Sequence, residues 1–85
     1  GLPPPAVLVH ECTFDDPETE KAERFGHSTP STVVQTVNAL RPAQCILTHF
    51  SSRYSFSECN GMAQSVQQRT HIPTVAGKER MIVTF

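Results

Sequence analysis

Ala6-Val7-Leu8-Val9-His10 decides the fold of this 85-residue chain, because it is a continuous apolar run, rich in β-branched residues, that ends in a histidine. Such a run predicts a short strand buried on both faces, as in a sheet covered by helices. A second run of this kind, Cys45-Ile46-Leu47-Thr48, is followed by His49. Strands that alternate with helical segments predict an α/β fold with helices packed on a sheet.

Two helices are predicted between these strands. Asp16-Pro17 provides an N-cap and a first turn for the first helix, with Asp16 as the cap, and Gly26 ends it. Ser28 or Thr29 can cap the second helix, and Pro30 suits its first turn. The apolar stripe predicted to face the core has the spacing of an amphipathic helix and comprises Val33, Val34, Val37 and Leu40.

The last part of the chain predicts a third helix over residues 57–69, capped by Ser57, with Met62 and Val66 on one face. The tail is interpreted as two strands, residues 72–76 and 81–85, joined by a hairpin at Gly77-Lys78-Glu79-Arg80. At the other end, residues 1–5 include three prolines in a row, which predict an extended lead-in.

The composition argues against several classes of protein. Seven Lys and Arg against eight Asp and Glu leave a net charge of -1, so no overall basic field would hold a nucleic acid, and any RNA contact must be local. No apolar run approaches the roughly 18 residues needed to span a bilayer. Three cysteines without a CxxC pair argue against a disulfide framework and a self-contained zinc knuckle. They favour an intracellular protein, with nucleus, mitochondrion and cytoplasm left open.

The histidines carry the chemical argument. In an α/β sheet reactive groups gather at the carboxyl ends of strands, and both predicted strands bring a histidine there, His10 and His49. A lone histidine is more often a hydrogen-bonded structural residue, which is the favoured interpretation of His10 and of His71 near a helix end. His49 differs because a polar loop with Arg53 follows it, and neutral imidazole is the commonest protein ligand of Zn²⁺.

His27 stands directly before the second predicted helix and is followed by Ser28 and Thr29. The unpaired N–H groups and positive dipole end of a helix N-terminus suit a phosphate, and the two hydroxyls add donors, although plain helix capping explains them as well. An imidazole beside a phosphate can protonate a leaving oxygen. Glu11 would supply the carboxylate that fixes the tautomer of such a histidine and favours its protonated form.

Three motifs, taken together, resemble ribonuclease Z, the endonuclease that removes 3′ trailers from precursor tRNA. They are His10-Glu11-Cys12-Thr13-Phe14, Gly26-His27-Ser28-Thr29 and Leu47-Thr48-His49-Phe50-Ser51-Ser52-Arg53-Tyr54. The resemblance extends from residue 10 to residue 54. It implies that residues 1–85 are the C-terminal segment of a metallo-β-lactamase αββα sandwich, incomplete on its own. Cys12 stands where the family's HEAT motif has alanine.

The resemblance also implies a role for each matching residue. His49 matches the family's last metal ligand, which binds one of two zinc ions. Glu11 and His27 match a pair that delivers a proton to the departing 3′ oxygen, while a metal-activated hydroxide attacks the phosphodiester in line. The residues expected near the substrate are Ser28, Thr29, Arg53 and Tyr54. For Arg53, a phosphate contact and a structural ion pair stay open as equal alternatives.

The sequence departs from the family in its metal ligands. The main metal-binding motif HxHxDH does not occur in it, nor do the family's further histidine and bridging aspartate, which lie upstream of the matching region. Because a catalytic zinc needs about three protein ligands, His49 alone would not hold one tightly, and the isolated chain is expected to be inactive. The expected partners are precursor tRNA and an upstream segment or second polypeptide that carries HxHxDH. A homodimer is compatible with this interpretation.

Two alternatives come from other classes of protein. A non-catalytic relative of ribonuclease Z would keep the fold as a scaffold or assembly module. Such a scaffold would have no chemical need for Glu11, His27 and His49, and all three are present. An autonomous small binding domain is disfavoured by the exposed core face that an incomplete sheet would leave. The sequence therefore favours part of a zinc-dependent endoribonuclease.

Overall fold

The computed structural model describes residues 3–77. The strands are β1 (Val7–Glu11), β2 (Gln44–Thr48) and β3 (Thr74–Ala76). The helices are the 3-10 helix η1 (Asp16–Glu18), α1 (Thr19–Phe25), α2 (Pro30–Leu40) and α3 (Phe56–Thr70). The predicted α/β class is therefore confirmed. The start of the lead-in at residues 1–2, the hairpin turn from residue 78 and strand 81–85 lie outside the described residues.

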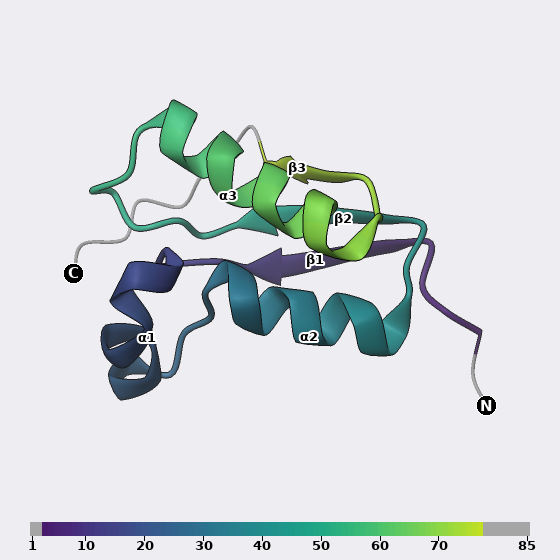
Figure 1. Ribbon diagram of the computed structural model, residues 1–85, viewed down its shortest axis with the longest axis horizontal. Coiled ribbons are helices and arrows are strands. Elements are labelled where there is room, and N and C mark those ends of the chain that lie inside the picture. Colours follow the sequence, from purple (N-terminus) through teal and green to yellow (C-terminus); the bar gives the residue numbers. More distant parts are fainter. Residues whose placement is uncertain (1–2, 78–85) are drawn as a thin grey trace.

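All three strands run parallel in the order β1-β2-β3 (Figure 1). Parallel neighbours need a crossover connection, which α1 and α2 supply between β1 and β2 and α3 supplies between β2 and β3. Both crossovers step across the sheet in the same direction, and such crossovers are right-handed, so their helices cover the same face. There α2 and α3 pack against each other.

The core lies between this face of the sheet and the two helices. Cys45 and Leu47 of β2 are fully buried with Val33 and Val37 of α2, as the predicted stripe requires. Leu40, in the last turn of α2, is 42% exposed, so the core-facing stripe ends before it. The residues that α3 contributes to the core are Cys59, Met62, Ala63 and Val66.

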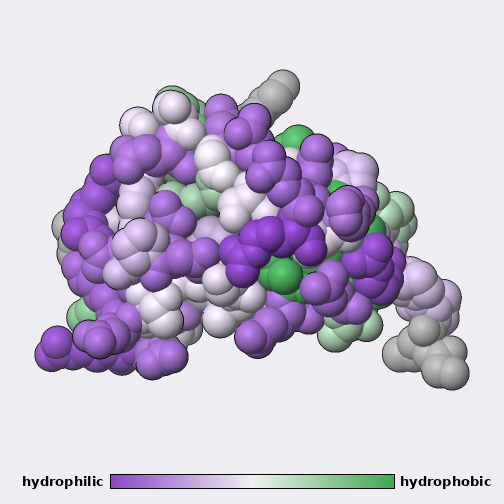
Figure 2. Space-filling model, viewed as in Figure 1, coloured by the Kyte–Doolittle hydropathy of each residue, from purple (hydrophilic) through white to green (hydrophobic). Residues whose placement is uncertain are grey.

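The opposite face of the sheet is open over the described residues. Val9, Ile46 and Val75 lie side by side in register across the three strands. Val9 is 60% exposed and Val75 47%. The prediction that β1 is buried on both faces is therefore wrong, because residues 3–77 place helices on one face only. The surface in the view of Figure 1 is mostly hydrophilic, with small hydrophobic areas (Figure 2).

Two helix starts differ from the predictions. Asp15, not Asp16, caps η1 and accepts a hydrogen bond from the N–H of Asp16 at 2.9 Å. The cap of α3 is Ser55 instead of Ser57, because Ser55 and Glu58 have the S-x-x-E spacing of a capping box. The end of the first helix is as predicted, since Gly26 closes α1 with a φ of 72°.

The three cysteines are free thiols, all buried. Burial, and secondarily the nearby Glu11 carboxylate, raises the pKa of the Cys12 thiol far above its usual range. That thiol also donates to the carbonyl of Phe14 at 3.9 Å. Among residues 3–77, no helix combines the length and the apolar character needed to cross a membrane.

Because only one face of the sheet is buried, shortening a side chain on the buried face should destabilise the protein more than the same change on the open face. Leu47→Ala, at a fully buried position, should lower the free energy of unfolding by about 2–5 kcal/mol, since it leaves a cavity in the core. Val9→Ala should cost about 1 kcal/mol or less, because the side chain is mostly in water. Urea denaturation of both variants measures the difference. An equal cost would mean that the open face is covered.

Candidate functional site

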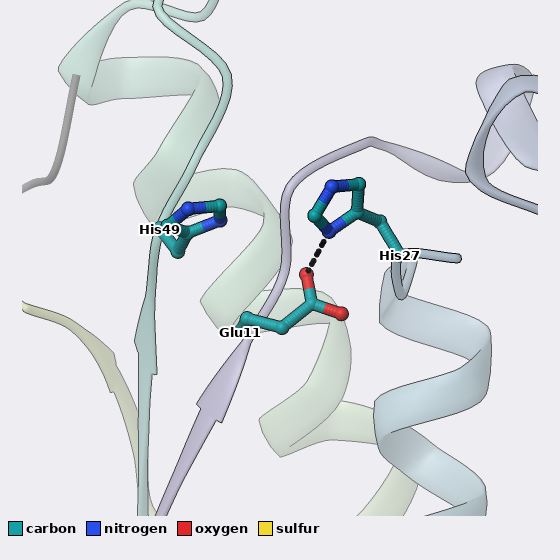
Figure 3. Close-up of side chains that lie close together, drawn as sticks. All are labelled: Glu11, His27 and His49. Carbon is teal, nitrogen blue, oxygen red and sulfur yellow. Dashed lines mark ion pairs between the residues drawn. The ribbon is translucent and has the colours of Figure 1, made fainter. Parts of the chain in front are cut away.

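The candidate site lies at the carboxyl ends of β1 and β2. Glu11 ends β1 and pairs in register with Thr48, the last residue of β2, so His49 follows at the same end of the sheet. His27 comes from the turn between α1 and α2. Figure 3 shows the three side chains of Glu11, His27 and His49 turned toward one another. The parallel register and the crossover turn thus bring together residues far apart in the sequence.

Distances within this cluster are short. His27 Nδ1 lies 3.6 Å from Glu11 Oε2, the contact dashed in Figure 3. The His27 and His49 rings are 5.6 Å apart between centroids, with 31° between their planes. One ligand atom of each of the three residues lies within 4.8 Å of the other two. The side chains of His27 and Glu11 remain 21% and 31% exposed, so solvent or a substrate can reach them.

Glu11 holds the cluster together through hydrogen bonds from two loops. Its Oε1 accepts from the N–H of Ser28 at 2.6 Å, and its Oε2 accepts from the N–H and the hydroxyl of Thr13 at 3.1 and 2.8 Å. Burial acts to raise the pKa of this carboxyl, but the hydrogen bonds from Thr13 and Ser28 together lower it below its usual 4.5. Glu11 is therefore held as a carboxylate at neutral pH.

Thr13 is a member of the site that the sequence analysis did not single out. Its side chain is fully buried, and its Oγ1 lies 2.9 Å from His49 Nδ1, 3.3 Å from His27 Nδ1 and 2.8 Å from Glu11 Oε2. The backbone of Thr13 is fixed as well, because its carbonyl accepts from the N–H of Ser51 at 2.9 Å. The sign of it in the sequence is its hydroxyl, two residues after Glu11 in the motif His10-Glu11-Cys12-Thr13-Phe14.

His49 has an unusual backbone. Its φ is 59°, in the left-handed region that costs a residue other than glycine about 1–2 kcal/mol. In this conformation its carbonyl oxygen lies 2.9 Å from the hydroxyl of Thr13 and is, beside Glu11 Oε2, a second acceptor for the single proton of that hydroxyl. Residues held in such an unfavourable backbone conformation cluster at functional sites.

The N-terminus of α2 is partly occupied by carboxylates of the protein itself. Asp16 accepts from the N–H of Ser31 in the first turn at 2.9 Å, and Glu11 already binds the N–H of Ser28. Thr29 begins the helix as predicted, but it is only 1% exposed. A direct contact between Thr29 and a substrate stays a prediction, and it would require this turn to move. Ser28 is half-buried and nearer to the solvent.

Arg53 and Tyr54 join the loop after β2 to the two ends of η1. Arg53 forms an ion pair with Glu18 at 3.6 Å, which is the structural alternative left open by the sequence. The hydroxyl of Tyr54 accepts from the N–H of Asp15 at 3.0 Å, and burial raises its pKa. Both side chains therefore lie beside the site, and a role in substrate binding stays a prediction.

The two remaining histidines have structural surroundings. His10 Nδ1 is 2.7 Å from the carbonyl oxygen of Glu11, to which it donates. His71 ends α3 with a φ of 61°, and its N–H donates to the carbonyl of Gln67 at 2.8 Å. Neither belongs to the cluster of Glu11, His27 and His49, and both agree with the structural interpretation favoured from the sequence.

The donor set suits zinc, which takes imidazole nitrogen and carboxylate oxygen. Two arrangements of such an ion are conceivable. An ion bound jointly by Glu11 Oε2 and the Nδ1 atoms of His27 and His49 would compete for space with Thr13 Oγ1, which lies within 3.3 Å of all three atoms. The hydrogen bonds of Thr13 are compatible instead with an ion at Nε2 of His49.

Known proteins resemble this chain at the level of sequence. No protein-family model matches it. It is 44% identical over 68 residues to ribonuclease Z of Pyrobaculum neutrophilum, covering 78% of this chain and 24% of the relative. It is 39% identical over 70 residues to ribonuclease Z of Anoxybacillus flavithermus, covering 82% and 22%. With zinc phosphodiesterase ELAC protein 1 of Homo sapiens it shares 44% identity over 48 residues, covering 56% and 13%.

The resemblance to ribonuclease Z inferred from the three motifs is thereby confirmed. The chain spans a quarter or less of the length of these relatives. The match covers most of the chain in the two ribonucleases.

The lowered pKa of Glu11 predicts an acid-sensitive contribution to stability. A carboxyl whose pKa is lowered by folding stabilises the folded state above its unfolded pKa, near 4.5, and this contribution is lost as the pH falls through the lower folded value. Glu11→Gln should therefore show a smaller loss of unfolding free energy between neutral pH and pH about 3. At neutral pH it should cost about 1–3 kcal/mol, because an amide cannot accept from both loops.

The matched control is Glu23→Gln, at an exposed position on α1. Urea denaturation of the protein and both variants at each pH gives the comparison. Glu23→Gln should follow the wild-type acid dependence. An acid dependence of Glu11→Gln equal to that of the wild type would contradict the assignment of this carboxylate to the hydrogen bonds described.

Proposed function

We propose that this chain is the C-terminal part of a zinc-dependent endoribonuclease that removes the 3′ trailer from precursor tRNA. The observation that carries the proposal is the convergence of Glu11, His27 and His49 at one end of the sheet. It occurs in a chain similar to proteins named ribonuclease Z and zinc phosphodiesterase. No observation favours the alternative of a non-catalytic scaffold.

The complete domain in this proposal is a metallo-β-lactamase αββα sandwich to which residues 1–85 contribute the C-terminal segment. The open face of the sheet supports it, since Val9, Ile46 and Val75 form an apolar row that a second layer would cover. The missing layer and an HxHxDH motif would come from an upstream segment or a partner chain. The 85 residues alone should therefore be inactive.

Two zinc ions would occupy the complete site, and this chain would provide one ligand, His49. When bound, zinc stabilises charge on the phosphate and makes water a nucleophile at neutral pH. The remaining ligands would come from the HxHxDH segment. Within this chain, the left-handed backbone of His49 and the hydrogen bond at its Nδ1 hold the imidazole in place.

His27 would deliver the proton to the departing 3′ oxygen. Its Nδ1 faces Glu11 Oε2 and Thr13 Oγ1, and in this proposal Nε2 is the ring nitrogen that contacts the substrate. The Glu11 carboxylate faces the ring, and its hydrogen bonds from Ser28 and Thr13 hold that carboxylate in position. Proton transfer from His27 leaves a neutral ring that solvent can protonate again.

Substrate phosphates would be bound beside this pair by Ser28 and Arg53, with Thr29 and Tyr54 shaping the two loops. The positive end of the α2 dipole lies next to Ser28. Arg53 is 43% exposed in its ion pair with Glu18, and exposed pairs contribute only about 0–1 kcal/mol. A phosphate can therefore compete with Glu18 for this guanidinium.

Two histidine variants separate the proposed roles in the complete protein. His27→Ala should slow cleavage of precursor tRNA by about 10²–10⁴-fold, the usual contribution of general acid catalysis, with zinc content nearly unchanged. His49→Ala should abolish cleavage and lower the zinc content as well. Metal analysis of purified variants beside a precursor-tRNA cleavage assay measures both quantities.

The control histidine is His71→Asn, at the far end of α3 in a left-handed conformation that asparagine tolerates. It should cleave and bind zinc like the wild type. Equal zinc loss in the His27 and His49 variants would refute the division of labour and favour a joint metal site. The proposed function would be overturned if the complete wild-type protein binds zinc but does not cleave precursor tRNA.

A further inference from the structure

The hydroxyl of Thr13 has more neighbours than it has protons. Its Oγ1 lies within hydrogen-bond distance of two groups that only accept, the ionised carboxylate of Glu11 at 2.8 Å and the backbone carbonyl of His49 at 2.9 Å. It also lies 2.9 Å from His49 Nδ1 and 3.3 Å from His27 Nδ1. A hydroxyl has one proton to donate and two lone pairs to accept with.

This count determines which nitrogen of His49 carries the proton. The single proton of Thr13 is directed to the carboxylate or the carbonyl, because neither of these can donate. An unprotonated Nδ1 on His49 would then face a lone pair of Oγ1 at 2.9 Å, an unfavourable contact in a fully buried position. The hydrogen bond forms only when Nδ1 of His49 is the donor.

We propose that Thr13 is a positioning residue that holds His49 as its Nδ1–H tautomer, so that the lone pair of Nε2 is presented to a metal ion. Zinc-binding histidines generally donate their second ring N–H to a fixed partner, which orients the ring. Here that partner is a buried hydroxyl, which Glu11 and the His49 carbonyl in turn orient. The link to zinc rests on the proposed function, while the tautomer is a property of this chain.

His27 provides an internal comparison. Its Nδ1 has the Glu11 carboxylate at 3.6 Å in addition to the Thr13 hydroxyl. When the hydroxyl is removed, His27 therefore keeps the Glu11 carboxylate as a neighbour. His49 loses the side-chain partner that lies 2.9 Å from its Nδ1. Removal of the hydroxyl should change the tautomer of His49 more than that of His27.

The test uses metal-free protein with ¹⁵N-labelled histidine at pH about 8.5, well above the ordinary histidine pKa. Long-range ¹H–¹⁵N spectra report which ring nitrogen is protonated. Wild-type His49 should be in the Nδ1–H form. Thr13→Val should move it toward the Nε2–H form that free histidine prefers, and Thr13→Ser should keep the wild-type form. Thr36→Val, the same change on α2, should leave both rings unaffected.

Three results would overturn the inference: an Nε2–H tautomer in the wild type, an unchanged Nδ1–H tautomer in Thr13→Val, or a serine variant that behaves like the valine variant. Thr13→Val removes a hydroxyl from a fully buried position, so circular dichroism checks that it folds. If it does not, the wild-type tautomer and the Thr13→Ser rescue still decide the question.

A second measurement connects the tautomer to the metal in the complete protein. Thr13→Val should weaken zinc binding by about 10–100-fold, measured by competition with a chelator, and Thr13→Ser should bind zinc like the wild type. Wild-type protein that has the Nδ1–H tautomer but does not cleave precursor tRNA would refute the proposed function alone. Protein that cleaves with His49 as the Nε2–H tautomer would refute this inference alone.

Discussion

The parallel pairing of β1 with β2 is the constraint on which the site depends. It places Glu11 opposite Thr48, so a carboxylate and the following His49 arrive at the same end of the sheet. Packing in the core fixes this register. Leu8 is paired with Cys45, and Cys45 and Leu47 are buried under α2 and α3. A slip of one residue would expose the core side chains and turn Glu11 away from the two imidazoles.

The polar groups of the site satisfy one another at close range. Thr13 is fully buried, yet its hydroxyl, N–H and carbonyl all have partners, and Glu11 is partly buried with donors from two loops. A buried polar network of this kind is rigid when complete and unfavourable when one member is missing. The strained φ of His49 persists in this setting, where its carbonyl oxygen and its ring Nδ1 both lie 2.9 Å from the Thr13 hydroxyl.

Local signals predicted much of this structure. The strand runs, the end of α1 at Gly26 and the start of α2 at Thr29 and Pro30 depend on a few neighbouring residues. The rule that parallel strands end together predicted that Glu11 and His49 lie at one end of the sheet. His27 was added from its place before a helix and from the resemblance to ribonuclease Z. Burial of β1 was mispredicted because an apolar run does not reveal which layers cover it. Thr13 was missed because its importance comes from distances between segments, and a hydroxyl in a sequence gives no sign of them.

The burial of Cys12 has a practical consequence. Cys12 lies between Glu11 and Thr13, and its N–H donates to the carbonyl of Thr48 at 2.9 Å. A thiol is alkylated as its thiolate, and a buried thiol with a strongly raised pKa is nearly inert in the folded state. Its labelling rate therefore reports how often the segment bearing Glu11 and Thr13 separates from β2. Cys45 and Cys59 lie in the same buried core as Cys12. With the same reagent, faster labelling of Cys12 than of these two would indicate local opening of this segment, and equal rates would indicate global unfolding.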